Sequence, residues 1–153
     1  MLFPITDAYE KVRKEKDEVM RTEEAPKDIM WFKQTIGNAC GTMGILHAVA
    51  NSPINLDPSS ALAKIFEDCK TKTPLERATY LEQSAAVESA HSKAAQEGQT
   101  EAPASDNHTD LHFSCFVAAE VAGKQSLVEL DGRRLGPIVH GPLRGGLLEA
   151  SLL

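Results

Sequence analysis

The chain has 153 residues, of which 42% are hydrophobic and 25% are charged, the balance and length of one soluble globular domain. Its formal charge of −6 argues against a nucleic-acid-binding surface and is compatible with a basic protein partner. No apolar run reaches the roughly 20 residues of a membrane span, and the N-terminus lacks the basic-then-apolar layout of a secretion signal. We therefore expect neither nucleic acid nor a membrane as a partner.

The first elements that the sequence predicts are a short apolar strand end at residues 2–5 and a charged helix capped by Thr6 or Asp7. Pro26 ends the helical pattern. Residues 29–36, IMWFKQTI, are bulky and apolar, which predicts a strand or an extended approach. The charges of the helix are expected on its solvated side, and the side chains expected together on its other face are Tyr9, Val12, Val19 and Met20.

The next segment, CGTMGILHAVAN at residues 40–51, is apolar nearly all round and predicts a buried helix that ends at Asn51. Cys40, Gly44 and Ala48 recur at every fourth position. They form a stripe of small residues where another backbone could come close.

Two further helices are predicted from their start signals. Asp57 and Pro58 indicate a cap followed by the first helical position. Residues 73–76, TPLE, form a capping box for a helix through Leu81 that restarts at Ser84. The apolar face of the first of these helices is expected to hold Ala61, Leu62, Ile65, Phe66 and Cys69.

A polar loop and a β-hairpin follow. Residues 95–110, AQEGQTEAPASDNHTD, contain no large apolar side chain, which predicts a functional lid or a disordered loop within a domain. LHFSCFVA and SLVEL then alternate as strands around a turn glycine. If the hairpin loop covers residues 119–124, His112 faces Asp131 with Cβ atoms about 5 Å apart, but a one-residue change in the loop would break this pairing.

The cysteines bear on both compartment and chemistry. Cys40, Cys69 and Cys115 are odd in number, far apart and without a C-x-x-C pair. This pattern gives no support to a zinc site or a redox motif. It predicts free thiols in a reducing compartment, the cytoplasm.

Cys40 is the candidate nucleophile. An ordinary thiol, with a pKa of about 8.5, holds little thiolate at neutral pH unless a helix start or an imidazole lowers that pKa. Cys40 opens a predicted helix, but His47 lies about 10 Å further along its axis. His112 remains as the base, with Asp131 placed to fix its tautomer, and Gln34 could donate to an oxyanion.

Each of these residues also has a structural interpretation. A lone cysteine at a helix start is more often structural than catalytic, and a strand histidine is usually a satisfied core or surface group. Asn38 is a candidate cap for the helix at Cys40. His91 and His108 are expected to be solvated, and His140, in PIVHGP, is the only rival base.

Four blocks, KQTIGNACGT, GILHAVAN, HFSCFV and ELDGRRLGPIVHG, resemble the ubiquitin C-terminal hydrolase family of cysteine peptidases in their order and spacing. The Gln-x5-Cys block with its N-x-C-G-T core is highly specific, and the resemblance runs to about Pro142. It implies an α/β fold of papain-like architecture, in which helices flank a central antiparallel sheet. It also implies that no metal or cofactor is needed.

The resemblance implies a thiol-dependent deubiquitinase that hydrolyses the bond after the C-terminal glycine of ubiquitin through an acyl-enzyme. Cys40 is then the nucleophile, His112 the general base and later acid, Asp131 the residue that orients His112, and Gln34 the oxyanion donor. Residues 95–110 correspond to the family's crossover loop over the active site. Ubiquitin or its adducts are the implied partners of an expected monomer.

The resemblance further implies that residues 1–153 form a single partial catalytic domain, truncated at both ends, because the family domain has elements before the first strand and after the last residues. Such a chain could instead be a catalytically weak or inactive module that still binds ubiquitin. A third interpretation, a redox-sensing thiol protein, rests on the low pKa expected for Cys40.

Overall fold

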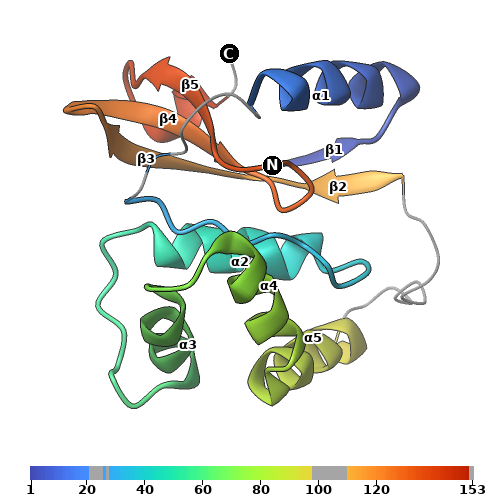
Figure 1. Ribbon diagram of the computed structural model, residues 1–153, viewed down its shortest axis with the longest axis vertical. Helices are drawn as coiled ribbons and strands as arrows, with labels where there is room; N and C mark the ends of the chain where they lie inside the picture. Colours follow the sequence, from blue (N-terminus) through green and yellow to red (C-terminus); the bar gives the residue numbers. More distant parts are fainter. Residues whose placement is uncertain (21–25, 27, 98–109, 152–153) are drawn as a thin grey trace.

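The computed structural model describes residues 1–20, 26, 28–97 and 110–151 as a mixed α/β fold. One helix, α1, lies on one side of the strands, and α2 to α5 lie on the other (Figure 1). None of the described helices is long and apolar enough to span a bilayer. In chain order the elements are β1 (Leu2–Pro4), α1 (Asp7–Met20), α2 (Cys40–Ala50), α3 (Ala61–Cys69), α4 (Pro74–Glu82), α5 (Ala85–Glu97), β2 (Leu111–Phe113), β3 (Cys115–Val121), β4 (Lys124–Leu130), β5 (Ile138–Pro142) and α6 (Leu147–Ala150).

The strands pair antiparallel throughout, in the orders β1-β2 and β3-β4-β5. The two sheets meet at Ser114, the single residue between β2 and β3. Its backbone N–H donates to the carbonyl of Met1 at 3.0 Å. The strand partner therefore changes at this residue: β2, before it, pairs with β1, and β3, after it, pairs with β4.

The β3–β4 hairpin is tighter than the sequence predicted. Its turn consists of Ala122 and Gly123, both with positive φ, 50° and 75°, the pair of conformations that a two-residue hairpin turn needs. A loop at residues 119–124 would have set Val128 opposite Cys115, but Leu130 lies there instead. The predicted register was therefore wrong by two residues.

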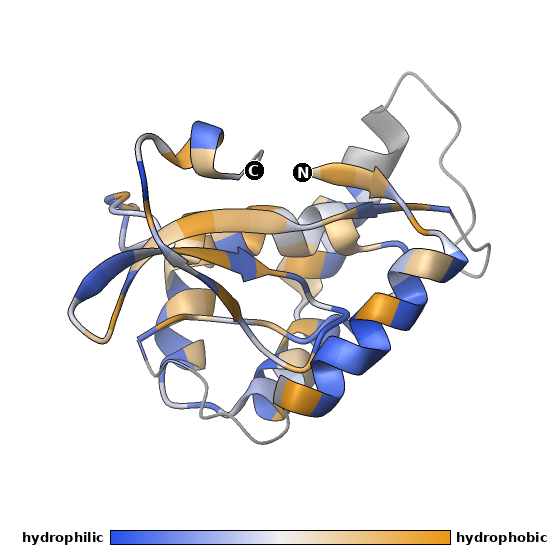
Figure 2. Cartoon of the chain, turned by 90° about the horizontal axis from the view of Figure 1, so that it is seen from above, coloured by the Kyte–Doolittle hydropathy of each residue, from blue (hydrophilic) through white to orange (hydrophobic). Residues whose placement is uncertain are grey.

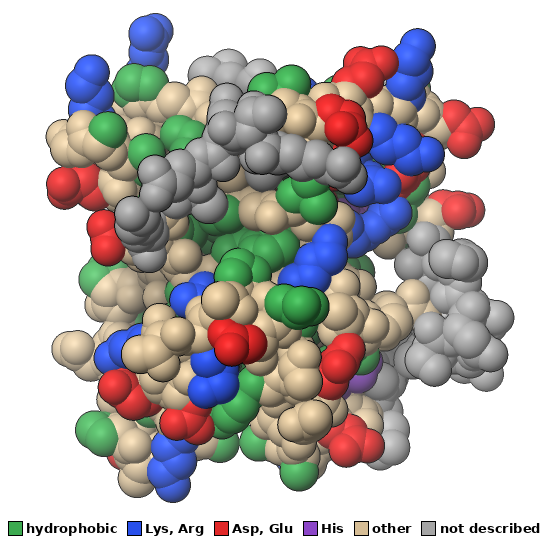
Figure 3. All heavy atoms as spheres, viewed as in Figure 1, with side chains coloured by type: hydrophobic (Ala, Val, Ile, Leu, Met, Phe, Trp, Pro, Cys, Tyr) green, Lys and Arg blue, Asp and Glu red, His purple; other side chains and the backbone are tan. Residues whose placement is uncertain are grey.

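Two hydrophobic clusters form the core, one on each side of α2. Figure 3 shows hydrophobic side chains gathered in the hollow between the strand layer and the helices beneath it. The cluster among the helices contains Phe32, Ala39, Met43, Leu46, Ile65, Phe66, Cys69, Leu81 and Val87. The cluster against the strands contains Ile29, Trp31, Cys115, Val117, Val128 and Leu130.

The helix α2 is not buried all round, contrary to the sequence-based expectation. Met43, Leu46 and His47 are buried, but the side chain of Ile45 is 65% exposed. A Cβ built on Gly44 would meet no described atom within 4 Å. The stripe of small residues therefore borders a groove, whose other walls include Phe113 and residues of β3 and α6, rather than receiving another backbone at Gly44.

Of the starts expected for α1, α3 and α4, two follow the predicted caps. Thr73 and Glu76 form the expected capping box at α4, and Thr6 accepts from the backbone N–H of Tyr9 at the start of α1. The cap of α3 is Ser60, so the start expected at Asp57 was wrong. Asp57 instead accepts from the backbone N–H of the residue two further on, at 2.8 Å, which holds a turn before the helix.

The inward face of α1 is polar, which the sequence-based assignment of its faces missed. Val12 and Val19, expected on a shared face, are exposed, whereas Asp17 is buried. Asp17 Oδ1 accepts from Arg134 Nε at 2.6 Å. The helix, which is largely hydrophilic along its length (Figure 2), turns this face toward the loop after β4 because that loop offers guanidinium groups rather than apolar side chains.

Residues 29–36 form no strand but run alongside that same loop. The backbone N–H of Gln34 donates to the carbonyl of Gly132 at 2.9 Å. A Cβ on Gly132 would lie 2.7 Å from Gln34 Cβ and 3.0 Å from its nitrogen. The absence of a side chain at Gly132 therefore permits this close approach. The polar loop was predicted at residues 95–110, but α5 extends to Glu97. Residues 98–109 lie outside the described residues.

We expect Gly132→Ala to destabilise the fold by about 1–3 kcal/mol, because the added methyl group must displace backbone atoms at Gln34. Urea unfolding measures the change. Gly44→Ala is the matched control, since the space around it is open and a helical Ala is favoured over Gly by about 0.5–1 kcal/mol. Equal effects of the two substitutions would contradict the close approach.

We expect Asp17→Asn to lower the free energy of unfolding by about 3 kcal/mol, because it takes the counterion from a buried guanidinium. The side chains of Arg134 and Asp17 are only 4% and 11% exposed. Glu67→Gln breaks the exposed pair with Lys70 and should change stability by less than about 0.5 kcal/mol. A small effect at Asp17 in chemical denaturation would show that the buried pair is dispensable.

Candidate active site

Cys40 is the first residue of α2 and is half-buried. The cap residue before it is Ala39, and no side chain caps the helix. The expectation that Asn38 would cap it was wrong, since the cap position is taken by Ala39 and Asn38 adopts φ 53°. The thiol thus lies at the positive end of a helix whose first amides are not neutralised by a side-chain cap.

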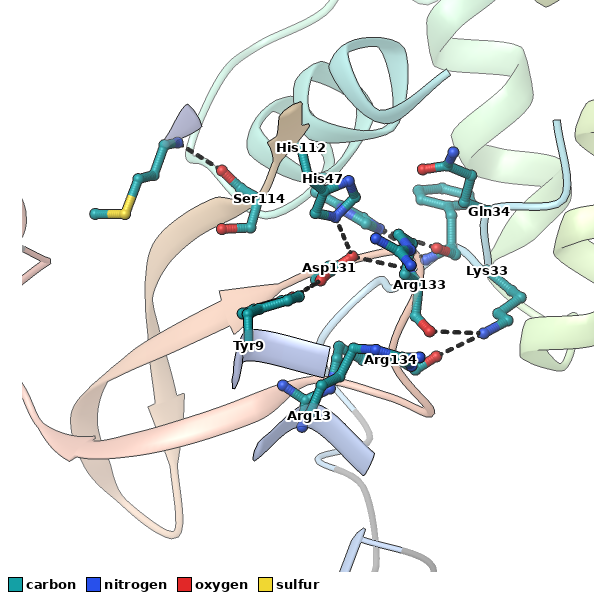
Figure 4. Close-up of polar contacts among 12 residues, drawn as sticks. Tyr9, Arg13, Lys33, Gln34, His47, His112, Ser114, Asp131, Arg133 and Arg134 are labelled. Atoms are coloured by element: carbon teal, nitrogen blue, oxygen red, sulfur yellow. Dashed lines mark hydrogen bonds and ion pairs between the residues drawn. The ribbon is translucent and has the colours of Figure 1, made fainter. Parts of the chain in front are cut away.

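The structure brings His112 and Asp131 together although the predicted register was wrong. His112 lies on β2 opposite Phe3, and Asp131 directly follows β4. His112 Nε2 lies 2.7 Å from Asp131 Oδ1 (Figure 4), and both side chains are buried. The change of partners at Ser114 takes β2 out of the β3–β4 ladder, so the imidazole reaches the end of β4 by tertiary packing rather than by strand pairing.

Four groups hold Asp131 in place. Its Oδ1 also accepts from the backbone N–H of Arg133 at 2.8 Å, and its Oδ2 accepts from the Tyr9 hydroxyl at 3.3 Å. Its backbone carbonyl accepts from Trp31 Nε1 at 3.1 Å. Burial raises the pKa of Asp131, but the hydrogen bonds and the charge of His112 outweigh burial and hold the pKa below its usual value.

The electrostatics of Cys40 and His112 are coupled. Burial raises the pKa of the Cys40 thiol, but a hydrogen bond from His112, its charge and backbone hydrogen bonds at Phe113 and Gly41 lower it overall. Burial lowers the pKa of His112, and hydrogen bonds with Asp131 and Cys40 reverse this and raise it to about 9. Because Asp131 occupies Nε2, Nδ1 is the ring nitrogen left for Cys40. This arrangement favours a thiolate–imidazolium pair.

Gln34 is tied to the same loop through its backbone, next to Asp131. Its side-chain Nε2 donates to the carbonyl of Ile36 at 3.2 Å. An amide nitrogen carries two hydrogens, so one remains for a further acceptor. Its Oε1 is buried and has no hydrogen-bond partner among the described residues.

The other histidines have separate roles. His47 is buried and accepts from the backbone N–H of Phe32 at 3.0 Å, and burial lowers its pKa to about 4, so it remains neutral. His140 pairs with Glu129 at 2.8 Å rather than with Asp131. His91 was expected to be solvated but contacts a hydroxyl of α2, Thr42 Oγ1, at 2.9 Å. His108 lies outside the described residues.

The sequence-based analysis missed two donors at the site, Tyr9 and Trp31. Tyr9 was assigned to an apolar face, and Trp31 to an apolar run. The one available signal was the spacing of Tyr9, Arg13 and Asp17 at every fourth position, a polar stripe on one side of the first helix.

Metal sites need clustered ligands, and the described residues contain no group of three or more His, Cys, Asp or Glu side chains that could hold a metal ion.

An α/β fold that brings a thiol at a helix start together with an imidazole and a carboxylate is that of a papain-like cysteine hydrolase. Residues 1–152 match the family described as ubiquitin carboxyl-terminal hydrolase, family 1. The chain belongs to this family.

Curated relatives agree with this assignment. The chain is 43% identical over 142 residues to ubiquitin carboxyl-terminal hydrolase 3 of Arabidopsis thaliana. The aligned segment covers 92% of this chain and 58% of the relative. It is 38% identical over 143 residues to ubiquitin carboxyl-terminal hydrolase isozyme L1 of Monodelphis domestica, covering 92% of this chain and 61% of the relative. The chain thus spans about three fifths of the length of these relatives.

The fold is also found in a solved structure, the Trichinella spiralis UCH37 catalytic domain bound to ubiquitin vinyl methyl ester. The TM-score is 0.66 at 22% sequence identity, over 99% of this chain and 63% of that chain. The likeness confirms the papain-like α/β architecture with antiparallel sheets that the sequence predicted.

We expect the pKa of Cys40 to lie below the roughly 8.5 of an ordinary thiol. His112→Ala should raise this pKa, because the hydrogen bond and the charge of His112, which oppose the effect of burial, are then lost. The thiolate forms above the lowered pKa of Cys40, and His112 remains protonated until the pH approaches about 9. The ion pair therefore exists between these two values. Ultraviolet absorbance of the thiolate against pH measures the ionisation of Cys40 in the wild type and in His112→Ala.

Cys115→Ser is the control for this titration, because burial raises the pKa of Cys115. Its loss should leave the first titration step in place, and Cys40→Ser should remove that step. The same midpoint in wild type and His112→Ala would contradict the coupling of the two groups.

Proposed function

We propose that this chain carries the catalytic machinery of a thiol-dependent deubiquitinase, which cleaves the bond after the C-terminal glycine of ubiquitin. The observation that carries the proposal is the contact of 2.7 Å between His112 and Asp131, with the lowered pKa of Cys40 beside them. The family assignment and the printed names of the relatives support ubiquitin as the substrate.

In the proposed reaction, Cys40 attacks first. Its sulfur bonds to the glycine carbonyl carbon, and the carbonyl π electrons move to the oxygen. The side-chain amide of Gln34 and a backbone N–H near Cys40 then donate hydrogen bonds to this oxyanion. His112 then gives its proton to the leaving amine as the carbon–nitrogen bond breaks, which leaves a thioester on Cys40. Asp131 keeps Nε2–H in place, so that Nδ1 serves as the reactive nitrogen.

The second half of the reaction uses the same groups in reverse. His112, now neutral, takes a proton from water, and the resulting hydroxide adds to the thioester carbonyl carbon. The carbon–sulfur bond then breaks, which returns the thiolate–imidazolium pair and releases the C-terminus of ubiquitin as a carboxylic acid, whose proton passes to solvent. No metal or cofactor takes part in these steps.

The remaining parts of the proposal concern the surroundings of the site. Residues 1–153 act as a single partial catalytic domain. Most of the segment at 95–110, expected to be a crossover loop, lies outside the described residues. The cytoplasm is proposed because the three free cysteines, Cys40, Cys69 and Cys115, suit a reducing compartment. The protein is proposed to act as a monomer.

A second candidate function, a ubiquitin-binding module with weak or no turnover, is favoured by an open groove beside the nucleophile. Gly41, Ile45 and Phe113 line this cavity of about 670 Å³ together with Leu147 and Leu148 of α6. Of these side chains, Ile45, Phe113 and both leucines are exposed. An apolar surface beside the site leaves the helix start of α2 less supported, and a misplacement of about 1 Å can lower a rate about 10²-fold.

We expect a ubiquitin probe with an electrophilic C-terminus to label this protein on Cys40, because the thiolate is the nucleophile and the probe presents the carbon that it attacks. Intact-mass spectrometry measures the adduct. Cys40→Ser should abolish labelling, and Cys69→Ser and Cys115→Ser should label as the wild type does, since both thiols are buried and burial raises the pKa of each.

Turnover of a ubiquitin C-terminal amide separates the two candidates. Hydrolysis well above that of Cys40→Ala supports the enzyme. Binding of ubiquitin with hydrolysis no faster than in Cys40→Ala supports the binding module. Labelling that persists in Cys40→Ser would remove Cys40 from the mechanism.

A further inference from the structure

The Tyr9 hydroxyl reaches the far oxygen of the carboxylate that faces His112. Tyr9 Oη donates to Asp131 Oδ2 at 3.3 Å, while Oδ1 accepts from His112 Nε2 and the backbone N–H of Arg133 (Figure 4). A carboxylate turns about its Cβ–Cγ bond, and that torsion is soft compared with an sp³–sp³ bond. Donors on both oxygens fix the plane of the group, and with it the direction in which Oδ1 faces the imidazole.

Tyr9 is itself held in place by aromatic packing. Its ring centroid lies 4.9 Å from that of Phe3, and the Phe3 ring meets the His112 ring edge-on, at 5.6 Å and 85°. Phe3 on β1 therefore contacts both the residue that donates to Asp131 and the residue that Asp131 orients. The hydroxyl, the carboxylate and the imidazole form one contiguous packed unit.

The helix that carries Tyr9 is fastened to the same loop at the residue after Tyr9, Glu10, and two turns further on, at Asp17. Arg13 pairs with Asp17, and Asp17 pairs with the buried Arg134. Glu10 pairs with Arg133 at 2.8 Å. These pairs fix α1 relative to residues 131–134, so the hydroxyl of Tyr9 is presented to Asp131 by a rigid element rather than by a loop.

We propose that Tyr9 is a positioning residue of the active site, whose hydroxyl orients Asp131 and through it the imidazole that activates Cys40. The inference rests on the proposed function for the role of Asp131. Burial of a tyrosine hydroxyl requires a partner in any fold, so a hydrogen bond alone does not separate positioning from stability. What separates them is whether the effect of removing the hydroxyl depends on Asp131.

The test is a double-mutant cycle of Tyr9→Phe and Asp131→Asn, with the rate of Cys40 alkylation by iodoacetamide as the first readout. This rate reports the thiolate and needs no ubiquitin. Near about pH 6 an ordinary thiol hardly reacts, and peptide mass spectrometry assigns the modified cysteine. All four proteins are compared at a temperature where circular dichroism shows each to be folded.

Tyr9→Phe keeps the ring that packs on Phe3 and should lower the alkylation rate about 3- to 10-fold, the range expected for one hydrogen bond. It should have no further effect when Asp131 is already Asn. Tyr80→Phe is the matched control, because it removes a tyrosine–aspartate hydrogen bond of 2.7 Å at an exposed position, to Asp68. That substitution should leave the rate unchanged.

Two outcomes overturn the proposal: an unchanged rate in Tyr9→Phe, or a decrease of the same size in the Asp131→Asn background, which would mark a structural role. Turnover of a ubiquitin C-terminal amide is the second readout, and a positioning role lowers kcat in Tyr9→Phe while KM stays constant. If the alkylation cycle shows coupling but the wild type hydrolyses no ubiquitin amide, the proposed function fails and the positioning role stands.

Discussion

The contact between the imidazole of His112 and the buried carboxylate of Asp131 is the constraint on which the rest of the site depends. A buried carboxylate is unfavourable unless donors surround it, and this one accepts from an imidazole, a backbone amide and a phenol. Those donors come from segments far apart in the chain. Satisfying one charge therefore fixes the relative positions of α1, β2 and the loop after β4.

The loop after β4 acts as a junction for these segments. Gly132 lets the extended segment at Gln34 approach within hydrogen-bonding distance. Arg133 and Arg134 are paired with acidic residues of α1, and the ammonium group of Lys33 donates to the carbonyls of both arginines. The candidate oxyanion donor and the candidate orienting carboxylate thus share one small, densely hydrogen-bonded region.

The side of α2 that carries its small residues is different in character. Gly41, Gly44 and Ala48 border an apolar cavity whose other walls come from β3 and α6. The candidate nucleophile, Cys40, precedes Gly41 and so lies between a closely packed polar network and this open apolar groove. The start of α2 is therefore packed closely on the side of His112 and borders open space on the other.

Local signals in the sequence determined much of this protein. The capping box at Thr73, the strands around Gly123 and the small-residue start of α2 are set by contacts within a few residues, and the family blocks indicated Cys40, His112, Asp131 and Gln34 together. Only the tertiary structure decided the hairpin register, the polar inner face of α1 and the donors from Tyr9 and Trp31. These features depend on which distant segment packs against each element. Whether a helix face is buried is decided by the side chains of the segment that covers it as well as by the hydropathy of the face itself.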